Sequence, residues 1–218
     1  MGFPMTVPGK PGVFIKKHAF KWEKVSKEST SILDEFKKKC VRCGEPFFST
    51  SEGKYFFREE CVYHWGRLKL AVDYEPYLTC CKDYPTSEGC TKCKAHVWSG
   101  THGGVNGPLL GFLQTKPSTT GCRQVFALDC ELVFTTMGLE VARVSLVNVD
   151  GSSQYDALVQ PEYEIIDFNS RFSGVTKEDY VLYKAKTLRQ AQYDLLQYIK
   201  SDTILVGHGI ENDLRALK

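Results

Sequence analysis

The sequence of 218 residues has no apolar run long enough to cross a lipid bilayer, which excludes proteins that span a membrane by helices. Residues 1–17 lack the apolar centre of a secretory signal, so we expect reduced cysteines and no membrane partner. A large excess of one charge is missing too, since the formal net charge is only +2. The apolar content of 42% and the charged content of 25% are ordinary for a globular protein.

The two halves of the chain differ in the sign of their charge. Residues 1–100 hold 17 Lys and Arg against 12 Asp and Glu, whereas residues 101–218 hold 11 against 14. A basic half attracts polyanions such as nucleic acid, and an acidic half attracts cations. Because an ordinary solvated surface also gives an excess of this size, the pattern is only a weak indication of nucleic-acid binding.

Cysteine, by contrast, is abundant and clustered, with seven of the nine cysteines between Cys40 and Cys93. Without a secretory signal, such close spacing indicates metal binding before it indicates disulfides. The pairs Cys40-x2-Cys43 and Cys61-x2-His64 have the spacing of two knuckles that together close a tetrahedral zinc site. We therefore predict one structural zinc ion on these four residues. The plainer alternative is a set of buried free cysteines with a core histidine.

A second cluster of ligand-type residues comprises Cys80, Cys81, Cys90, Cys93 and His96. Cys81, Cys90 and His96 predict a second zinc ion, with the fourth ligand from one of the two remaining cysteines. Since adjacent residues point to opposite sides of an extended chain, we expect one of Cys80 and Cys81 not to be a ligand. The two clusters can also interleave, so the sequence leaves the pairing of ligands open.

The segment Val125–Glu131 combines an apolar strand with two carboxylates, Asp129 and Glu131. Residues two apart on a strand point to the same face, so these carboxylates project side by side. Adjacent buried carboxylates are unfavourable unless something offsets their charge, and a divalent cation does so through oxygen ligands. The segment therefore indicates a metal site, although an edge strand with one polar face in water is the common alternative.

Downstream of this strand the sequence predicts an α/β domain. Alternation and turn residues predict strands at 140–149, 154–159 and 203–206, and a helical period predicts a helix at 187–199. The first three strands are expected to form an antiparallel meander. We divide the chain into a basic N-terminal arm (1–37), a small Cys/His-rich zinc-binding module (38–98), a flexible linker (99–123) and the N-terminal part of the α/β domain (124–218).

Four motifs stand in order downstream of the cysteine-rich segment Cys40–His96: Ala127–Glu131, Gly138–Val144, Asn169–Thr176 and Thr203–Lys218. Together they resemble the RNA exonuclease 1 and GOR family, one branch of the DEDD exonucleases. Asp-x-Glu alone is a weak motif, but the ordered set with Arg-Phe-Ser-Gly-Val-Thr between is specific. The resemblance covers residues 38–218 and implies a ribonuclease H-like exonuclease fold.

The resemblance implies a 3′→5′ RNA exonuclease that acts on single-stranded 3′ ends, releases nucleoside 5′-monophosphates and resides in the nucleus. It implies two Mg²⁺ or Mn²⁺ ions, with Asp129 bridging both and with Glu131 and Asp213 completing their protein ligands. Two such ions activate the attacking water and stabilise the leaving oxygen. The residues expected against the terminal nucleotide are Leu132, Gly174, Val175 and Thr176.

The family also carries a third motif, His-x4-Asp, whose histidine is the general base and whose aspartate is the last metal ligand. His208 and Asp213 have this spacing but already occupy the second motif, so we interpret His208 as a turn residue that supports the strand end. The sequence thus predicts a truncated nuclease domain with impaired catalysis. The rival hypothesis is a non-catalytic, zinc-stabilised module that binds RNA or protein, and no particular protein partner is indicated.

Overall fold

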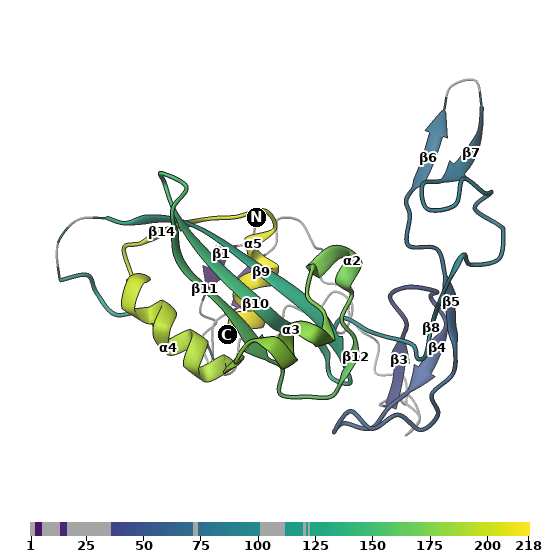
Figure 1. Ribbon diagram of the computed structural model, residues 1–218, viewed down its shortest axis with the longest axis horizontal. Coiled ribbons are helices and arrows are strands. Elements are labelled where there is room, and N and C mark those ends of the chain that lie inside the picture. Colours follow the sequence, from purple (N-terminus) through teal and green to yellow (C-terminus); the bar gives the residue numbers. More distant parts are fainter. Residues whose placement is uncertain are drawn as a thin grey trace.

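The structure is a computed structural model, which describes residues 3–5, 14–16, 36–71, 74–100, 112–119, 121 and 123–218. Figure 1 shows two bodies next to each other, a cysteine-rich body of residues 36–100 and a sheet body of residues 123–218. Ahead of them, β1 (Phe3–Met5) and β2 (Phe14–Lys16) pair antiparallel within the predicted basic arm. None of the described helices is long and apolar enough to span a bilayer.

The sheet body is built on three long antiparallel strands, β9 (Val125–Thr135), β10 (Gly138–Asn148) and β11 (Ser153–Gln160). Short strands complete the sheet: β12 (Ile165–Asp167) and β14 (Ile204–Val206) pair with β9, and β13 (Lys186–Thr187) pairs with β11. The predicted meander and the predicted strand near residue 203 are present, and β14 runs parallel to β9. β12 and β13 are too short to show the alternation of apolar and polar residues from which a strand is predicted.

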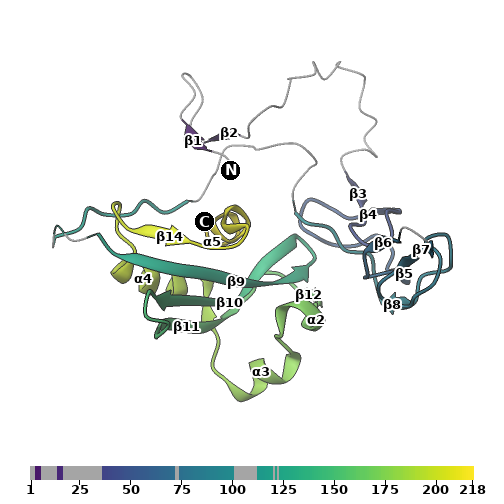
Figure 2. The same cartoon turned by 90° about the horizontal axis from the view of Figure 1, so that it is seen from above.

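Helices occupy the connections of the sheet body, which confirms the predicted α/β class with a central sheet. Those described are α2 (Ser170–Ser173), α3 (Lys177–Leu182), α4 (Leu188–Tyr198) and α5 (Ile210–Leu217). The predicted helix is α4, which begins at a capping box where Thr187 and Gln190 each accept from the other's backbone amide. Figure 2 shows α5 beside β9 and next to β14, and α5 contacts β9.

Alternation along β9 separates a core face from a carboxylate face. Leu128 and Cys130 are 1% and 8% exposed, whereas Asp129 and Glu131 project from the opposite face. The core joins alternate residues of the long strands with one side of α4: Phe126, Leu128, Cys130, Val144, Leu146, Val159, Ala191 and Leu195. Burial of the apolar set thus fixes which way the two carboxylates point.

Short hairpins make up the cysteine-rich body. β3 (Lys37–Lys39) pairs with β4 (Pro46–Phe48), β5 (Cys61–Tyr63) with β8 (Thr91–Cys93), and β6 (Leu68–Ala71) with β7 (Tyr74–Leu78), all antiparallel. The buried members of its main apolar cluster are Cys40, Phe47, Cys61 and Trp98. Because so small a core stabilises little, a body of this size is expected to need further cross-links such as metal ions.

The cysteine-rich body docks on the turn between β9 and β10. Trp98 is 8% exposed, and its indole nitrogen donates to the carbonyl oxygen of Thr136 at 3.2 Å. Gly138 has a φ of +113°, and a Cβ at this position would lie 2.3 Å from the Cα of Gly100. This close backbone approach requires glycine, so the two bodies meet as packed surfaces.

The described parts of the predicted linker contact the sheet body. The amide of Leu113 donates to the carbonyl oxygen of Lys218 at 2.8 Å, and the amide of Ser201 donates to that of Lys116 at 2.9 Å. These bonds hold residues 113–116 along the C-terminal elements. Residues 101–111 lie outside the described residues, so the prediction of flexibility stays a prediction there.

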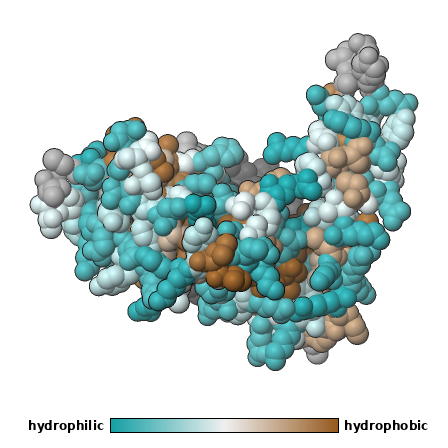
Figure 3. Space-filling view, in the orientation of Figure 1, coloured by the Kyte–Doolittle hydropathy of each residue, from teal (hydrophilic) through white to brown (hydrophobic). Residues whose placement is uncertain are grey.

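The face drawn in Figure 3 is largely hydrophilic, with apolar atoms gathered where Figure 1 places α3. Val181 and Leu182 are 80% and 72% exposed at the end of this helix. The helix is anchored through Tyr180, whose hydroxyl lies 3.3 Å from the carbonyl oxygen of Ala142 and 2.7 Å from that of Val159. One side chain thus ties α3 to both β10 and β11.

Candidate functional site

Three carboxylates converge where α5 passes β9. Asp129 and Glu131 project from the strand, and Asp213, in the first turn of α5, is 6% exposed. Burial and the charge of Asp129 raise the pKa of Asp213 to about 6, against a backbone hydrogen bond at Cys130 that lowers it. Because Asp213 is hydrogen-bonded to the backbone of Cys130, which lies between Asp129 and Glu131, the structure brings the first and second motifs together.

Glu131 and Cys130 respond to the same charges. Burial raises the pKa of Glu131 and the charge of Asp129 raises it further, whereas Arg143 on the facing strand lowers it. Burial also raises the pKa of the Cys130 thiol, and the charges of Asp213, Asp129 and Glu131 act in the same direction. The charge of Asp129 therefore opposes the ionisation of Glu131 and Asp213, a like-charge arrangement that a bound cation would relieve.

The chemistry of this trio suits hard divalent cations, because all three side chains offer carboxylate oxygens. Asp129 is exposed and Glu131 half-buried, so these two carboxylates are accessible to solvent, whereas Asp213 is buried. Among the described residues, the sets of ligand-type atoms that lie within 4.8 Å of one another are two Cys/His groups, and the trio is not one of them. A bound cation would draw Asp129 and Glu131 toward the buried Asp213.

A cavity of about 430 Å³ opens beside Asp129. Its wall combines apolar residues of β9, β10 and β14 with Ser145 and the turn Gly207-His208. His208 is exposed and lines the cavity together with Asp129. The interpretation of His208 as a turn residue agrees with its place after β14, but it did not foresee that this imidazole faces the same space as the first carboxylate.

The residues expected against a terminal nucleotide differ in how much surface they offer. Leu132 is half-buried on β9, and Gly174 is exposed with a φ of +67°. Val175 is 2% exposed and its side chain packs in a core cluster. The hydroxyl of Thr176 is engaged with Asp179 in the capping box of α3. The accessible part of this loop is therefore its backbone around Gly174, and its contact with a substrate stays a prediction.

The first Cys/His group comprises Cys40, Cys43, Cys61 and His96, whose ligand atoms all lie within 4.8 Å of one another. The Sγ atoms of Cys40 and Cys61 are 3.7 Å apart, and the Sγ of Cys43 lies 3.3 Å from Nδ1 of His96. Three thiols and one imidazole at this separation are the donor set of a closed tetrahedral zinc site.

The second Cys/His group comprises His64, Cys80, Cys81 and Cys90. The Nδ1 of His64 lies 3.6 Å from the Sγ of Cys80 and 3.5 Å from that of Cys81. Its Nε2 lies 3.1 Å from the carbonyl oxygen of Ser87. Because a hydrogen bond from Nε2 fixes the imidazole tautomer, Nδ1 is left free to bind a metal.

The observed groups correct two predictions made from the sequence. The pairing predicted first puts His64 in the first group and His96 in the second, whereas the structure has His96 in the first group and His64 in the second. This arrangement is the predicted alternative in which the two clusters interleave. Cys80 and Cys81 both belong to the second group, because residues 79–81 form a turn rather than an extended segment. The zinc ions themselves remain a prediction, and the donor atoms fit it.

Cys93, the other candidate for the second ion, belongs to neither group. Its thiol donates to Oδ2 of Asp167 at 2.9 Å and accepts from Nη1 of Arg42 at 2.9 Å. Sequence reasoning missed Arg42, whose one local signal is a long cation placed between Cys40 and Cys43. The guanidinium reaches from the cysteine-rich body to the end of β12.

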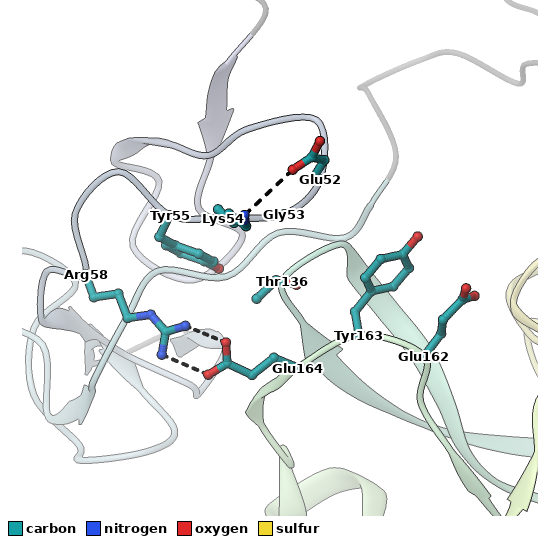
Figure 4. Close-up of a pocket in the computed structure, with 9 residues that line it drawn as sticks. All are labelled: Glu52, Gly53, Lys54, Tyr55, Arg58, Thr136, Glu162, Tyr163 and Glu164. Carbon is teal, nitrogen blue, oxygen red and sulfur yellow. Dashed lines mark hydrogen bonds and ion pairs between the residues drawn. The ribbon is translucent and has the colours of Figure 1, made fainter.

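A cavity of about 470 Å³ lies between the two bodies (Figure 4). Arg58 of the cysteine-rich body donates two hydrogen bonds to Glu164 of the sheet body, at 3.0 and 2.6 Å. In Figure 4 this pair lies below Tyr55 and Thr136, at one side of the cavity. Its lining mixes charges of both signs and includes none of the trio, so we regard it as part of the junction.

Curated relatives match the chain closely over much of its length. Human RNA exonuclease 1 homolog is 40% identical over 220 residues, which cover 100% of this chain and 17% of that protein. Chimpanzee exonuclease GOR is 41% identical over 182 residues, covering 82% of this chain and 26% of that protein. This chain belongs to the RNA exonuclease 1 and GOR family. No family model matches it.

A yeast member of the family, RNA exonuclease 1 of Saccharomyces cerevisiae, is 43% identical over 107 residues, covering 49% of this chain and 19% of that protein. The chain thus spans about a quarter or less of the length of these relatives. A solved structure, the Neurospora crassa Pan2 catalytic unit, aligns at 23% identity and a TM-score of 0.40, over 48% of this chain and 20% of that one. That likeness is too slight to carry an argument about this member of the RNA exonuclease 1 and GOR family.

Proposed function

We propose that the sheet body is the nuclease part of a 3′→5′ RNA exonuclease with a ribonuclease H-like fold, which releases nucleoside 5′-monophosphates from single-stranded RNA in the nucleus. The observation that carries the proposal is the convergence of Asp129, Glu131 and Asp213, in which the charge of Asp129 raises the pKa of both partners. Relatives named RNA exonuclease support RNA as the substrate.

Divalent cations bound to the trio, Mg²⁺ or Mn²⁺, would supply an activated water and stabilisation of the leaving oxygen. Asp129 is exposed and its charge acts on both Glu131 and Asp213, so it is the carboxylate that two ions would share. Asp213 is buried and held by the backbone at Cys130, so it provides the fixed side of the site. The apolar wall of the cavity beside Asp129 offers a surface on which a nucleotide can pack.

Full activity by this mechanism needs a general base and a further carboxylate. Within residues 1–218, the one His-x4-Asp spacing is that of His208 and Asp213, and Asp213 already serves the trio. We therefore expect a polypeptide of these residues to hydrolyse RNA about a thousandfold more slowly than one that also carries a third motif, since a general base alone contributes about 10²–10⁴-fold.

The test compares residues 1–218 with a polypeptide extended by a relative's third motif. Both are incubated with a uniformly labelled single-stranded RNA and Mg²⁺ or Mn²⁺, and labelled nucleoside monophosphates are quantified. Asp129→Asn should abolish activity in the extended version and weaken Mn²⁺ binding, measured by calorimetry, in both. Glu59→Gln is the control, because it removes an exposed carboxylate of the cysteine-rich body and should change neither readout.

Three outcomes would count against this proposal. If both polypeptides hydrolyse RNA equally fast and Asp129→Asn abolishes both rates, then His208 or a second copy of the chain supplies the base. If Mn²⁺ does not bind near Asp129 and the extended polypeptide is inactive, the exonuclease assignment is wrong. Release of oligonucleotides instead of monophosphates would indicate internal cleavage.

The two Cys/His groups favour a second candidate function, a zinc-stabilised module that binds RNA or protein without catalysis. In that case removal of zinc abolishes RNA binding, whereas Asp129→Asn leaves it unchanged. Fluorescence anisotropy of a labelled RNA, measured without divalent cations other than zinc, distinguishes this function from the exonuclease.

A further inference from the structure

Arg42 is a buried cation at the junction of the two bodies. Its side chain is 8% exposed, and its Nη1 donates to Oδ2 of Asp167 at 2.8 Å and to the Sγ of Cys93 at 2.9 Å. The guanidinium carbon lies 4.8 Å from the ring centroid of Tyr63 and 4.9 Å from that of Phe134. Arg42 is therefore held between a ring of the cysteine-rich body and a ring of β9.

The carboxylate that Arg42 binds controls the start of α2. Oδ1 of Asp167 accepts from the amide of Asn169 at 2.6 Å, and Oδ1 of Asn169 accepts from Nη2 of Arg42 at 3.4 Å. Asn169 is the N-cap of α2 and has a φ of +53°, a left-handed conformation that asparagine adopts more readily than most residues with a side chain. Arg42 and Asp167 together hold this residue in place.

From Asn169 the chain runs through α2 into the loop expected to contact the terminal nucleotide. The hydroxyl of Ser170 donates to the carbonyl oxygen of Val175 at 2.6 Å, and that of Ser173 donates to the carbonyl oxygen of Phe168 at 2.8 Å. These internal bonds make residues 168–176 one compact unit. A shift at its start is therefore passed to its end.

The cysteine-rich body holds α2 at a second point. The guanidinium carbon of Arg171 lies 4.0 Å from the ring centroid of Trp65, and the rings of Trp65 and Phe172 meet edge to face with centroids 6.3 Å apart. Trp65 directly follows His64 of the second Cys/His group. In each Cys/His group, a residue next to one of the ligand residues therefore holds α2. These residues are Arg42 beside Cys43 and Trp65 beside His64.

We propose that the cysteine-rich body is a metal-dependent brace that positions residues 167–176 for the 3′-terminal nucleotide of RNA, with Arg42 as the positioning residue. This inference rests on the proposed exonuclease function. Arg42 lies between Cys40 and Cys43, so a zinc ion held by the first Cys/His group would fix the backbone of this knuckle and keep the guanidinium directed at Asp167. Loss of such an ion would release residues 167–176 and leave the carboxylate trio in place.

The first test is amide hydrogen exchange of the zinc-loaded 218-residue chain, which needs no activity. Arg42→Gln should make exchange in residues 168–176 about tenfold faster or more, since one hydrogen bond to a charged group is worth at least that factor. Arg42→Lys keeps the charge without the planar pair of donors, so it should restore part of the protection. Asp167→Asn leaves the knuckle untouched and should accelerate exchange in residues 168–176 by a factor similar to that of Arg42→Gln. If Arg42→Gln fails to fold, Asp167→Asn decides the test.

Arg58→Gln is the matched control. It breaks a second ion pair that the described residues form between the two bodies, with Glu164, which does not involve residues 167–176. Exchange in residues 168–176 should then be that of the unchanged chain. Equal acceleration by Arg58→Gln and Arg42→Gln would overturn Arg42 as the positioning residue. Unchanged exchange in both Arg42→Gln and Asp167→Asn would overturn the brace itself.

The second test measures RNA. Binding of a short linear RNA with a free 3′-hydroxyl is compared with binding of the same sequence closed into a circle, which has no end to position. Arg42→Gln should weaken binding of the linear RNA about tenfold and leave the circular RNA unaffected. In a version extended by a relative's third motif, KM should rise more than kcat falls, because the carboxylates are intact.

The two tests separate this inference from the proposed function. If the unchanged chain neither binds nor hydrolyses RNA, the exonuclease assignment fails, and the exchange experiment still decides whether the brace exists. If exchange accelerates in Arg42→Gln while binding of linear RNA stays the same, the assignment of residues 167–176 to the terminal nucleotide is overturned.

Discussion

The Sγ of Cys40 lies 3.7 Å from the Sγ of Cys61, although the two residues are 21 positions apart and both are free thiols. We expect elemental analysis of the purified chain to give two zinc ions, one for each Cys/His group. Cys61→Ser should lose one ion and unfold the cysteine-rich body, because binding of a structural metal supplies folding energy. Circular dichroism measured together with zinc content tests this.

Cys93→Ser is the control for that experiment, because Cys93 belongs to neither group. It should keep the zinc content of the unchanged chain. A chain with one zinc ion would refute the second group as a metal site. A chain with none, and with its cysteines in disulfides, would refute both groups.

Leu128 offers a test of the core behind the carboxylates. It is 1% exposed in the main cluster of the sheet body, and Leu128→Ala should lower the free energy of unfolding by about 2–5 kcal/mol through lost burial and the cavity left behind. Leu70→Ala, at a side chain that is 77% exposed, should change it by less than about 0.5 kcal/mol. Urea denaturation measures both, and equal effects would mean that the cluster does not stabilise the fold.

Gly138 and Gly151 form a matched pair for the junction between the two bodies. Both have a positive φ, but a Cβ on Gly151 would meet nothing within 4 Å, whereas one on Gly138 would lie 2.3 Å from Gly100. Gly151→Ala should lower the free energy of unfolding by about 1–2 kcal/mol from backbone strain alone. Gly138→Ala should lower it further, because the backbones must separate. Similar losses in urea denaturation would show that the close approach contributes nothing.

A pH dependence is expected at Asp194 on α4. The hydrogen bond from Lys186 and then that from Tyr155, at 2.9 Å, lower the pKa of Asp194. A carboxyl with a lowered folded-state pKa stabilises the folded protein at pH values above its unfolded-state pKa of about 3.9. This stabilisation is lost as the pH falls through the folded-state pKa. Asp194→Asn should lower the free energy of unfolding by up to about 1 kcal/mol at neutral pH, as for other exposed ion pairs.

Urea denaturation over a pH series measures this difference, which should disappear in strong acid. Lys186→Gln removes the other partner and should abolish most of the same pH dependence. A difference between Asp194→Asn and the unchanged chain that stays constant down to the lowest pH would point to packing rather than ionisation.

The strand that carries the first two carboxylates could be predicted because its signal is local. Leu128 and Cys130 enter the core while Asp129 and Glu131 do not, and this alternation is visible in consecutive residues. The role of Asp167 could not be predicted in the same way. It depends on Arg42, which is 125 positions earlier in the chain, and no periodicity records a contact of that range.

The Cys/His groups show the same limit within one small body. Residue types and spacing were enough to predict two sets of ligands, but not the exchange of His64 and His96. That exchange follows from strand pairing, because Cys61 of β5 lies opposite Cys93 of β8 and the chain after β8 returns His96 to the first group. The pairing brings together segments that have no shared pattern in the sequence.

This exchange would also set the order in which the two groups could capture metal ions as the chain is made. Every ligand of the second group, from His64 to Cys90, lies between the first group's Cys40 and His96. A ribosome adds about 5–20 residues per second from the N-terminus. All residues of the second group are therefore synthesised before His96, the last residue of the first group. The second group therefore has all four of its residues before the first group does, and Trp98 follows both groups in the chain.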